Sequence, residues 1–174
     1  MGTAAAYPPV KLVAGFIFSD DNACKKARAA LVRRFGAIDF ESGVIPFTYT
    51  DYYEKEFGTG LKRVFVSFKR LVPLDRLARI KAATNSIENS LAVKKYRPVN
   101  IDPGFVDLAK LVLATTKDFC HRIYLSKGIF AEVTLVYKDR SFRHWEWTYP
   151  DYRTPEYIAI FNHIRELYAK QLKK

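Results

Sequence analysis

One stretch decides the fold, and it reads His121-Arg-Ile-Tyr-Leu-Ser-Lys-Gly-Ile-Phe-Ala-Glu-Val-Thr-Leu135. Its two β-branched and aromatic runs are separated by Ser126-Lys127-Gly128, which is typical of a three-residue hairpin loop with glycine at the left-handed position. A hairpin has a fixed register, because side chains alternate between the two faces of a strand pair. The register predicts that Arg122 lies opposite Glu132 on one face of the sheet.

This hairpin continues into a third strand. A turn at Asp139-Arg140 predicts that Tyr137 lies opposite Phe142, and the register then brings Glu132 opposite Trp147. The result is a three-stranded antiparallel meander with two different faces. One face is expected to be apolar and carries Ile123, Leu125, Ile129, Ala131, Val133 and Leu135. The other face is mixed and carries Arg122, Tyr124, Phe130, Glu132, Thr134, Trp145 and Trp147.

The residues before the meander alternate between strand and helix patterns. Residues 11–18 predict a buried strand, and the N-cap candidates at 19–22 begin a helix that ends at Gly36. Strands at 38–48 and 63–72, a second helix opened by Pro73 and a short strand at 97–102 complete the order β-α-β-β-α-β. That order is typical of a split βαβ, ferredoxin-like unit. The fold class is therefore predicted as α+β.

Two more helices are expected in the second half of the chain. Asp102-Pro103 reads as an N-cap followed by proline at the first helical position, which predicts a short buried helix through residue 113. Thr154-Pro155-Glu156 predicts the start of a C-terminal helix. Residues 10–174 are expected to form a single α+β domain, and residues 1–9 a disordered tail.

Composition restricts the class of protein. In 174 residues, 49% are hydrophobic and 27% charged, which is typical of a folded chain. No apolar run is long enough to cross a membrane, and the first residues do not resemble a secretory signal. The two cysteines, Cys24 and Cys120, argue against a zinc ribbon and against a disulfide scaffold. We therefore expect a cytoplasmic protein without a membrane partner.

The net charge of +11 is unevenly distributed. The three successive thirds of the chain carry an excess of 0, +7 and +4, and the densest region runs from residue 62 to residue 97. Clustered positive charge attracts phosphates, so this region is a candidate for binding a polyanion. An ordinary solvated surface is the alternative interpretation. The candidate polyanion patch consists of Lys62, Arg63, Arg76, Arg79 and Lys81.

The hairpin also brings together side chains that could take part in catalysis or binding. Arg122 and Glu132 are expected to meet beside Tyr124 and Thr134, where a carboxylate held by arginine suits positioning or metal binding better than general-acid catalysis. A cross-strand ion pair without a function is the alternative. His121 is predicted on the opposite, apolar face, either as a hydrogen-bonded core residue or as a catalytic base.

Three further polar residues occupy positions expected to be apolar or structural. Asp102 either caps the predicted helix or marks an anion site at the helix N-terminus. Lys110, on that same helix, must reach solvent, pair with an acid or face a cavity. Thr84 interrupts the apolar stripe of the second helix, as a satisfied core contact or as the rim of a pocket.

Several motifs are missing. The sequence contains no Gly-x-x-x-x-Gly-Lys-Ser/Thr phosphate loop, no dinucleotide-binding Gly-x-Gly-x-x-Gly and no His-Glu-x-x-His. These absences argue against a P-loop GTPase, a Rossmann enzyme and a zincin. No metal site is predicted, and the sequence indicates no particular cofactor.

A set of short motifs resembles one known family. In order along the chain, they are residues 52–58, 84–88, 100–104, 110–117, 121–125, 132–135 and 147–152. Together they resemble the bacterial domain-of-unknown-function 4416 family over residues 11 to about 172. The resemblance implies a bacterial or similar cytoplasmic source and no established activity.

Two functions remain open at this stage, and the oligomeric state is not predicted. The first is binding of a phosphate-bearing ligand, a nucleotide or RNA, through the basic patch and a pocket shared by Arg122, Glu132 and Lys110, with nearby aromatic rings as stacking surfaces. The second is a small hydrolase or transferase acting on a phosphorylated substrate, with Glu132, Arg122 and His121 as catalytic residues. The predicted ligand-binding residues are Lys110, Thr84, Asp102, Tyr124, Thr134 and Trp147.

Overall fold

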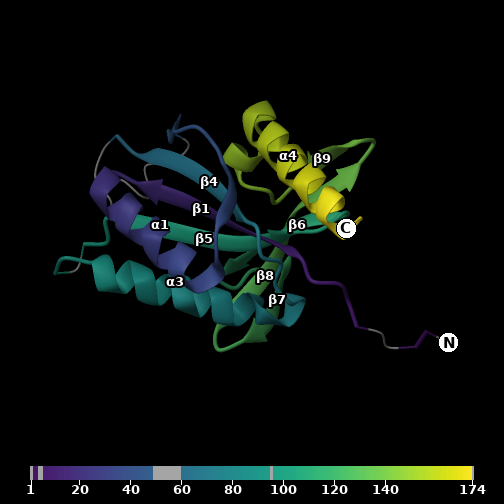
Figure 1. Cartoon of the computed structure of the whole chain (residues 1–174), viewed down its shortest axis with the longest axis horizontal. Helices are drawn as coiled ribbons and strands as arrows, with labels where there is room; N and C mark the ends of the chain where they lie inside the picture. The colour runs from purple at the N-terminus through teal and green to yellow at the C-terminus, as the bar shows by residue number, and fades with distance from the viewer. Residues whose placement is uncertain (1, 4–5, 49–59, 95, 174) are drawn as a thin grey trace.

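The computed structural model describes residues 2–3, 6–48, 60–94 and 96–173 (Figure 1). Its helices are α1 (Asp21–Phe35), α3 (Leu77–Leu91) and α4 (Pro155–Leu172), with the short 3₁₀ helices η1 (Leu74–Arg76) and η2 (Pro150–Arg153). Its strands are β1 (Lys11–Phe18), β2 (Ile38–Glu41), β3 (Ile45–Pro46), β4 (Lys62–Phe68), β5 (Val99–Val106), β6 (Lys110–Thr115), β7 (Arg122–Ser126), β8 (Ile129–Lys138) and β9 (Ser141–His144).

Within the described residues, nine strands form one antiparallel sheet with the order β2-β4-β1-β5-β6-β8-β7. The strand β3 pairs with β4, and β9 pairs with β8. The α+β class is thus confirmed, and β1, α1, β2, β4, α3 and β5 follow the expected order. The ferredoxin-like arrangement is not matched, because the sheet continues past β5 into β6, β8 and β7.

The helices α1 and α3 cover one face of the sheet. Asp20 caps α1 by accepting hydrogen bonds from the backbone N–H groups of Asn22 and Ala23, as the N-cap signal predicted. The helix ends at Gly36, whose φ of +97° favours glycine. The core beneath these helices includes Leu12, Phe16, Ala27, Leu31, Phe68, Leu77, Ile80 and Ile101.

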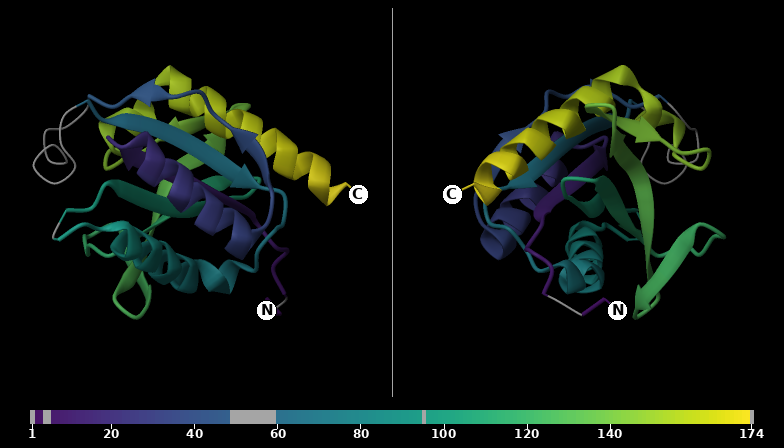
Figure 2. Two further views of the ribbon diagram at one scale, coloured as in Figure 1. Left: turned by 60° about the vertical axis from the view of Figure 1, so that its left-hand side comes forward. Right: turned by 90° about the vertical axis from the view of Figure 1, so that its right-hand side faces the viewer.

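The helix α4 covers the opposite face, as the two views of Figure 2 show. Thr154 caps it by accepting a hydrogen bond from the backbone N–H of Tyr157. The predicted buried stripe of Tyr157, Phe161, Ile164 and Tyr168 is confirmed. Tyr168 also donates its hydroxyl to the backbone carbonyl of Pro9, so the segment just before β1 lies beside the last turns of α4 (Figure 1).

The predicted helix at 103–113 is wrong, because β5 and β6 occupy these residues as an antiparallel pair. Both faces of these strands are buried, and a run that is apolar on all sides fits a buried strand as well as a buried helix. Pro103 is tolerated because β6 pairs with β5 only from Gly104 onward. Gly104 is required, since a Cβ there would lie 2.3 Å from the carbonyl oxygen of Val112.

The predicted meander is correct in its hairpins and wrong in its arrangement. Arg122 lies opposite Glu132, and Tyr137 opposite Phe142, as expected. However, β6 occupies one edge of β8, so β7 and β9 both pair along the other edge, one after the other. The strand β9 ends at His144, and Trp147 therefore does not pair with Glu132.

The turn between β7 and β8 is shorter than the predicted three residues. Ser126 lies opposite Ile129, which leaves a two-residue turn of Lys127 and Gly128 with positive φ at both positions. Leu125 is the extra residue of a bulge that precedes this turn. The apolar face is also incomplete, since Ile123 and Leu125 are exposed.

The predicted domain boundary stays a prediction. In the proposed tail, the Tyr7 hydroxyl donates to Asp107, and the carbonyl of Pro9 accepts a hydrogen bond from the Tyr168 hydroxyl. The motif at residues 52–58 lies outside the described residues.

Candidate functional site

The candidate site lies on β8 where its outer edge changes partner. The strand β9 pairs with residues 135–138 of β8, and β7 pairs with residues 129–132. Val133 and Thr134 lie between these two stretches. We call this place the β8 gap.

Side chains occupy the β8 gap instead of a strand. The Trp147 indole N–H donates to the carbonyl of Val133 at 3.2 Å, and the Thr148 hydroxyl donates to the carbonyl of Thr134 at 2.7 Å. Thr148 is fully buried and also accepts a hydrogen bond from the backbone N–H of Trp145 at 2.8 Å. The turn after β9 is therefore fixed to the sheet by the groups that complete the edge of β8.

Glu132 lies beside the β8 gap and organises its polar groups. It is 3% exposed, and its Oε2 lies 2.9 Å from Arg122 Nε and 3.0 Å from His121 Nε2. The Thr134 hydroxyl lies 3.4 Å from Oε1. These contacts hold the Glu132 carboxylate in one place, which suits a role in positioning its neighbours.

Arg122 connects Glu132 to the loop after β9. Besides Glu132, its guanidinium donates to the carbonyl of Lys117 and to the Tyr149 hydroxyl, each at 3.0 Å. Burial lowers the pKa of Arg122, but its hydrogen bonds with Glu132 and Tyr149 outweigh burial and raise the pKa above its ordinary value. The side chain is thus held as a fixed cation beneath the loop.

Aromatic rings form a stack on the solvent side of this polar cluster. Trp145 and Trp147 stack at 5.2 Å between ring centroids with an interplanar angle of 11°, and Trp147 stacks on His121 at 5.2 Å and 13°. We call these three residues the aromatic stack. Phe119 packs with its edge against His121, and Tyr149 is exposed nearby. Trp145 and Trp147 are 39% and 38% exposed, so the stack is in contact with solvent.

The sequence identified most residues of this cluster but misplaced one. The Arg122–Glu132 pair is confirmed, and Thr134 contacts Glu132. The prediction that His121 lies on the opposite face is wrong, because His121 precedes β7 and the alternation of a strand does not apply to it. Tyr124 lies further along the edge, against Phe130, where its hydroxyl accepts a hydrogen bond from the backbone N–H of Gly128.

The predicted cavity shared by Lys110, Glu132 and Arg122 is wrong. Lys110 begins β6 and pairs with Asp107 at 2.7 Å, in the turn that joins β5 to β6. Glu132 lies opposite Leu113, three residues further along β6. The ammonium of Lys110 is paired with Asp107, which lies three residues earlier in the chain. It therefore needs no carboxylate from β8.

Asp102 and Thr84 also make contacts within the fold. Asp102 lies within β5 and caps no helix; its carboxylate contacts Arg63 at 3.4 Å and Lys81 at 3.7 Å. Thr84 is buried in α3, where its hydroxyl donates to the carbonyl of Lys81. In the described part of the chain, these contacts join Asp102 and Thr84 to β4 and α3 and not to the aromatic stack.

Charged residues of α3 complete an open edge of β5. Since β6 pairs only from Gly104 onward, Ile101 has a strand neighbour on one side, β1. Lys81 donates to the carbonyl of Ile101 at 2.9 Å, and the N–H of Ile101 donates to Glu88 at 2.8 Å. Glu88 in turn pairs with Arg97 at 2.8 Å. We call this arrangement the β5 clip.

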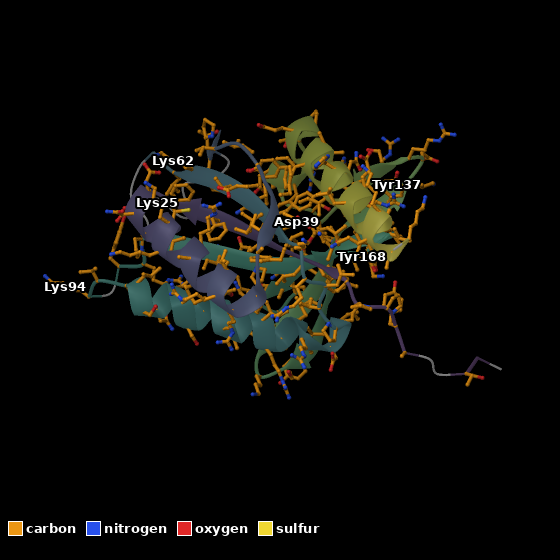
Figure 3. All side chains as sticks on the ribbon, viewed as in Figure 1. Lys25, Asp39, Lys62, Lys94, Tyr137 and Tyr168 are labelled. Atoms are coloured by element: carbon orange, nitrogen blue, oxygen red, sulfur yellow. The ribbon has the colours of Figure 1, made fainter. Side chains whose placement is uncertain are left out.

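The predicted polyanion patch is not one surface. Arg63 and Lys81 are buried, so they cannot contact a polyanion. Lys62 lies opposite Phe18 at the end of β1, whereas Val72, just before Arg76, pairs with Val10 at the start of β1. Figure 3 shows Lys62 at the opposite end of the molecule from Tyr137 on β8. The five residues therefore do not act together.

Sequence reasoning missed the role of Arg63. Its guanidinium is 1% exposed and donates to the Tyr152 hydroxyl at 2.6 Å, with Asp151 at 3.8 Å. Burial raises the pKa of Asp151, and the charge of Arg63 opposes that rise. Gly15 makes room for Phe65 and Arg63, since a Cβ there would lie 3.0 Å from a ring carbon of Phe65 and 3.3 Å from the guanidinium carbon of Arg63. A charged residue at the start of a buried strand, opposite a short acidic loop, was the available signal.

Within the described residues, no group of three or more His, Cys, Asp and Glu side chains could hold a metal ion. No helix among them is long and apolar enough to cross a membrane.

The chain matches the family model described as "Domain of unknown function (DUF4416)" over residues 8–168. The chain belongs to the DUF4416 family. No curated protein and no solved structure matches it. Of the quoted motifs, residues 121–125, 132–135 and 147–152 meet at the β8 gap, whereas residues 84–88 and 100–104 meet at the β5 clip.

Proposed function

We propose that this DUF4416 protein binds a nucleotide or single-stranded RNA at the β8 gap. The observation that carries the proposal is the solvent-exposed stack of Trp145, Trp147 and His121. Every nucleobase has a flat face, and stacking on aromatic side chains contributes about 1–3 kcal/mol per base. A fixed, exposed pair of indoles suits such a ligand.

The surroundings of the stack support this ligand class. The hairpin of β8 and β9 carries the exposed basic residues Lys138, Arg140 and Arg143, and Arg143 lies two residues before Trp145. Bases that stack on the indoles would bring their phosphates within reach of such side chains. The excess positive charge of the chain adds a general attraction for phosphate.

Rigidity also supports binding. The aromatic stack packs beside the hydrogen-bonded pair of Glu132 and Arg122. Thr148 fixes the turn that carries both indoles. A surface that is ordered before binding loses little conformational entropy when the ligand arrives. The free thiols of Cys24 and Cys120 fit a cytoplasmic location, which we include in the proposal.

The alternative of a hydrolase or transferase stays a prediction. Glu132 is buried, and its donors His121, Arg122 and Thr134 already surround it. This geometry favours a role in holding the aromatic stack.

The proposal is tested by anisotropy of a labelled oligouridylate of about ten nucleotides at low salt, where phosphate contacts are strong. We expect Trp145→Ala to weaken binding by about tenfold, the loss of roughly one stacked base. Tyr7→Ala, at another exposed aromatic residue, is the matched control and should bind as the wild type does. Equal binding by all three proteins would contradict the proposal.

Charge reversal separates the site from general electrostatics. Arg143→Glu should weaken binding and reduce its salt dependence, because one phosphate contact is lost. Arg79→Glu changes the net charge equally but lies on α3, and should have a smaller effect. If both variants lose the same affinity, the protein binds RNA through its overall charge and not at the β8 gap.

A further inference from the structure

The strand β7 is an open edge of the described sheet. Its one strand neighbour is β8. Its central side chains are unusually exposed for apolar residues, at 68% for Ile123, 59% for Tyr124 and 40% for Leu125. An edge strand with exposed apolar side chains is a template for pairing with another strand.

The sequence of β7 complements itself under a two-fold axis. If two copies of β7 pair antiparallel with Tyr124 opposite Tyr124, each of the five residues has a residue of the second copy opposite it, and the backbone N–H of Arg122 keeps its bond to the carbonyl of Phe119. Ile123 then lies opposite Leu125 of the second copy, and the same contact occurs twice. Cross-strand pairs of apolar side chains are the stabilising unit of such a sheet.

Charge also favours a second copy at this edge. A net charge of +11 makes two copies repel each other over most of their surface. On β7 the one charged side chain is Arg122, and Glu132 neutralises it at 2.9 Å. The strand β2, at the far end of the sheet, carries Asp39 and Glu41 and has no comparable apolar run.

We propose that two copies of this chain associate through antiparallel pairing of their β7 strands, centred on Tyr124. The pairing is closed, because each copy uses its β7 edge once and the two sheets join into one. The bulge at Leu125 limits the regular ladder to a short stretch. This association does not depend on the proposed RNA binding.

The dimer is expected to be weak. Three exposed apolar side chains and five paired residues bury far less than the roughly 1,200–2,000 Å² of a stable interface. We therefore expect a dissociation constant in the micromolar range or above, which is typical of small interfaces.

Sedimentation velocity over a series of protein concentrations up to about 200 μM tests the association. The wild type should shift from monomer to dimer, and Ile123→Lys should remain a monomer because it places two new charges in the paired strands. Val44→Lys, at a residue exposed to a similar degree, is the control and should dimerise as the wild type does. A wild type that stays monomeric, or an Ile123→Lys variant that still dimerises, overturns the proposal.

A disulfide tests the register. In a Cys120→Ser background, Tyr124→Cys brings two cysteines opposite each other at the two-fold axis, within the Cα separation that a disulfide spans. Air oxidation should yield a covalent dimer. Ile123→Cys is the control, because its copies lie diagonally, beyond the roughly 7 Å limit for a disulfide. Burial raises the pKa of the Cys24 thiol to about 12, which keeps that residue unreactive.

Two results oppose the proposed register. One is equal cross-linking by Tyr124→Cys and Ile123→Cys, and the other is no cross-linking by Tyr124→Cys. The Trp145→Ala variant should dimerise like the wild type, so a failure of RNA binding and a failure of dimerisation are distinguishable.

Discussion

The β5 clip and the β8 gap both supply hydrogen-bond partners to a stretch of strand that has no neighbouring strand. In each place a strand lacks a neighbour over a short length, and its backbone groups need hydrogen-bond partners. At Ile101 the partners are the charged side chains of Lys81 and Glu88, which are buried beneath α3. At Val133 the partner is the indole of Trp147, which remains at the surface.

Under the proposed function, the β5 clip has a structural role and the β8 gap has a binding role. In the β5 clip, Lys81 and Glu88 are buried and use their charged groups for hydrogen bonds to Ile101, while Arg97 is partly exposed. The β8 gap needs one N–H group at Val133, yet it presents two stacked indoles and an imidazole. Exposed aromatic area beyond what hydrogen bonding requires is typical of a binding surface.

The largest effect is expected from breaking the β5 clip. Glu88→Ala removes the acceptor of the Ile101 N–H and leaves Arg97 without this carboxylate. Because the Ile101 N–H is buried and loses its acceptor, the free energy of unfolding should fall by about 3 kcal/mol. Urea denaturation measures this change. RNA affinity of the folded fraction should not change, and a loss of affinity would contradict the division between the two regions.

A smaller effect is expected from the buried hydroxyl of the β8 gap. Thr148→Val keeps the shape of the side chain but removes its bonds to Thr134 and Trp145. We expect a loss of about 2 kcal/mol in the free energy of unfolding. RNA binding should also weaken, because the turn carrying the indoles is no longer fixed. Ser86→Ala, which removes an exposed hydroxyl on α3, is the control for both measurements.

The pH dependence of the β5 clip gives a third test. Burial raises the pKa of Glu88 above its ordinary value of 4.5, so the folded state binds its proton more tightly than the unfolded state does. The charged form is therefore a cost that is present above the raised pKa and is relieved as the pH falls toward 4.5. Relative to Glu88→Gln, the wild type should gain stability as the pH is lowered from about 7 to about 5. A pH-independent difference between the two proteins would contradict this account.

The sequence was sufficient wherever a local signal determined the structure. The caps at Asp20 and Thr154 and the pairing of Arg122 with Glu132 follow from residues within one element or one hairpin. It was insufficient where tertiary context decided. Residues 103–113 are apolar on nearly all sides, and only their neighbours on β1 and β8 make them strands.

The same limit applies to the candidate site. The register brought Arg122, Glu132 and Thr134 together, because side-chain alternation is local. It could not show that β6 takes the second edge of β8, and so it could not predict the stack of Trp147 on His121. The charge pattern failed for a similar reason, since Arg63 and Lys81 have their partners in other elements.

The smallest expected effect separates the two roles of the aromatic stack. Trp147→Phe keeps a flat ring beside His121 but removes the N–H that donates to Val133. One partly solvated hydrogen bond contributes little, so the free energy of unfolding should fall by about 0.5–1 kcal/mol. RNA affinity should change less than in Trp145→Ala, because a ring remains in the stack. Thermal denaturation and RNA anisotropy of both variants give four values that test this assignment. If Trp147→Phe loses as much RNA affinity as Trp145→Ala does, the hydrogen bond to Val133 and not the ring surface determines binding, and the β8 gap is then closer in kind to the β5 clip.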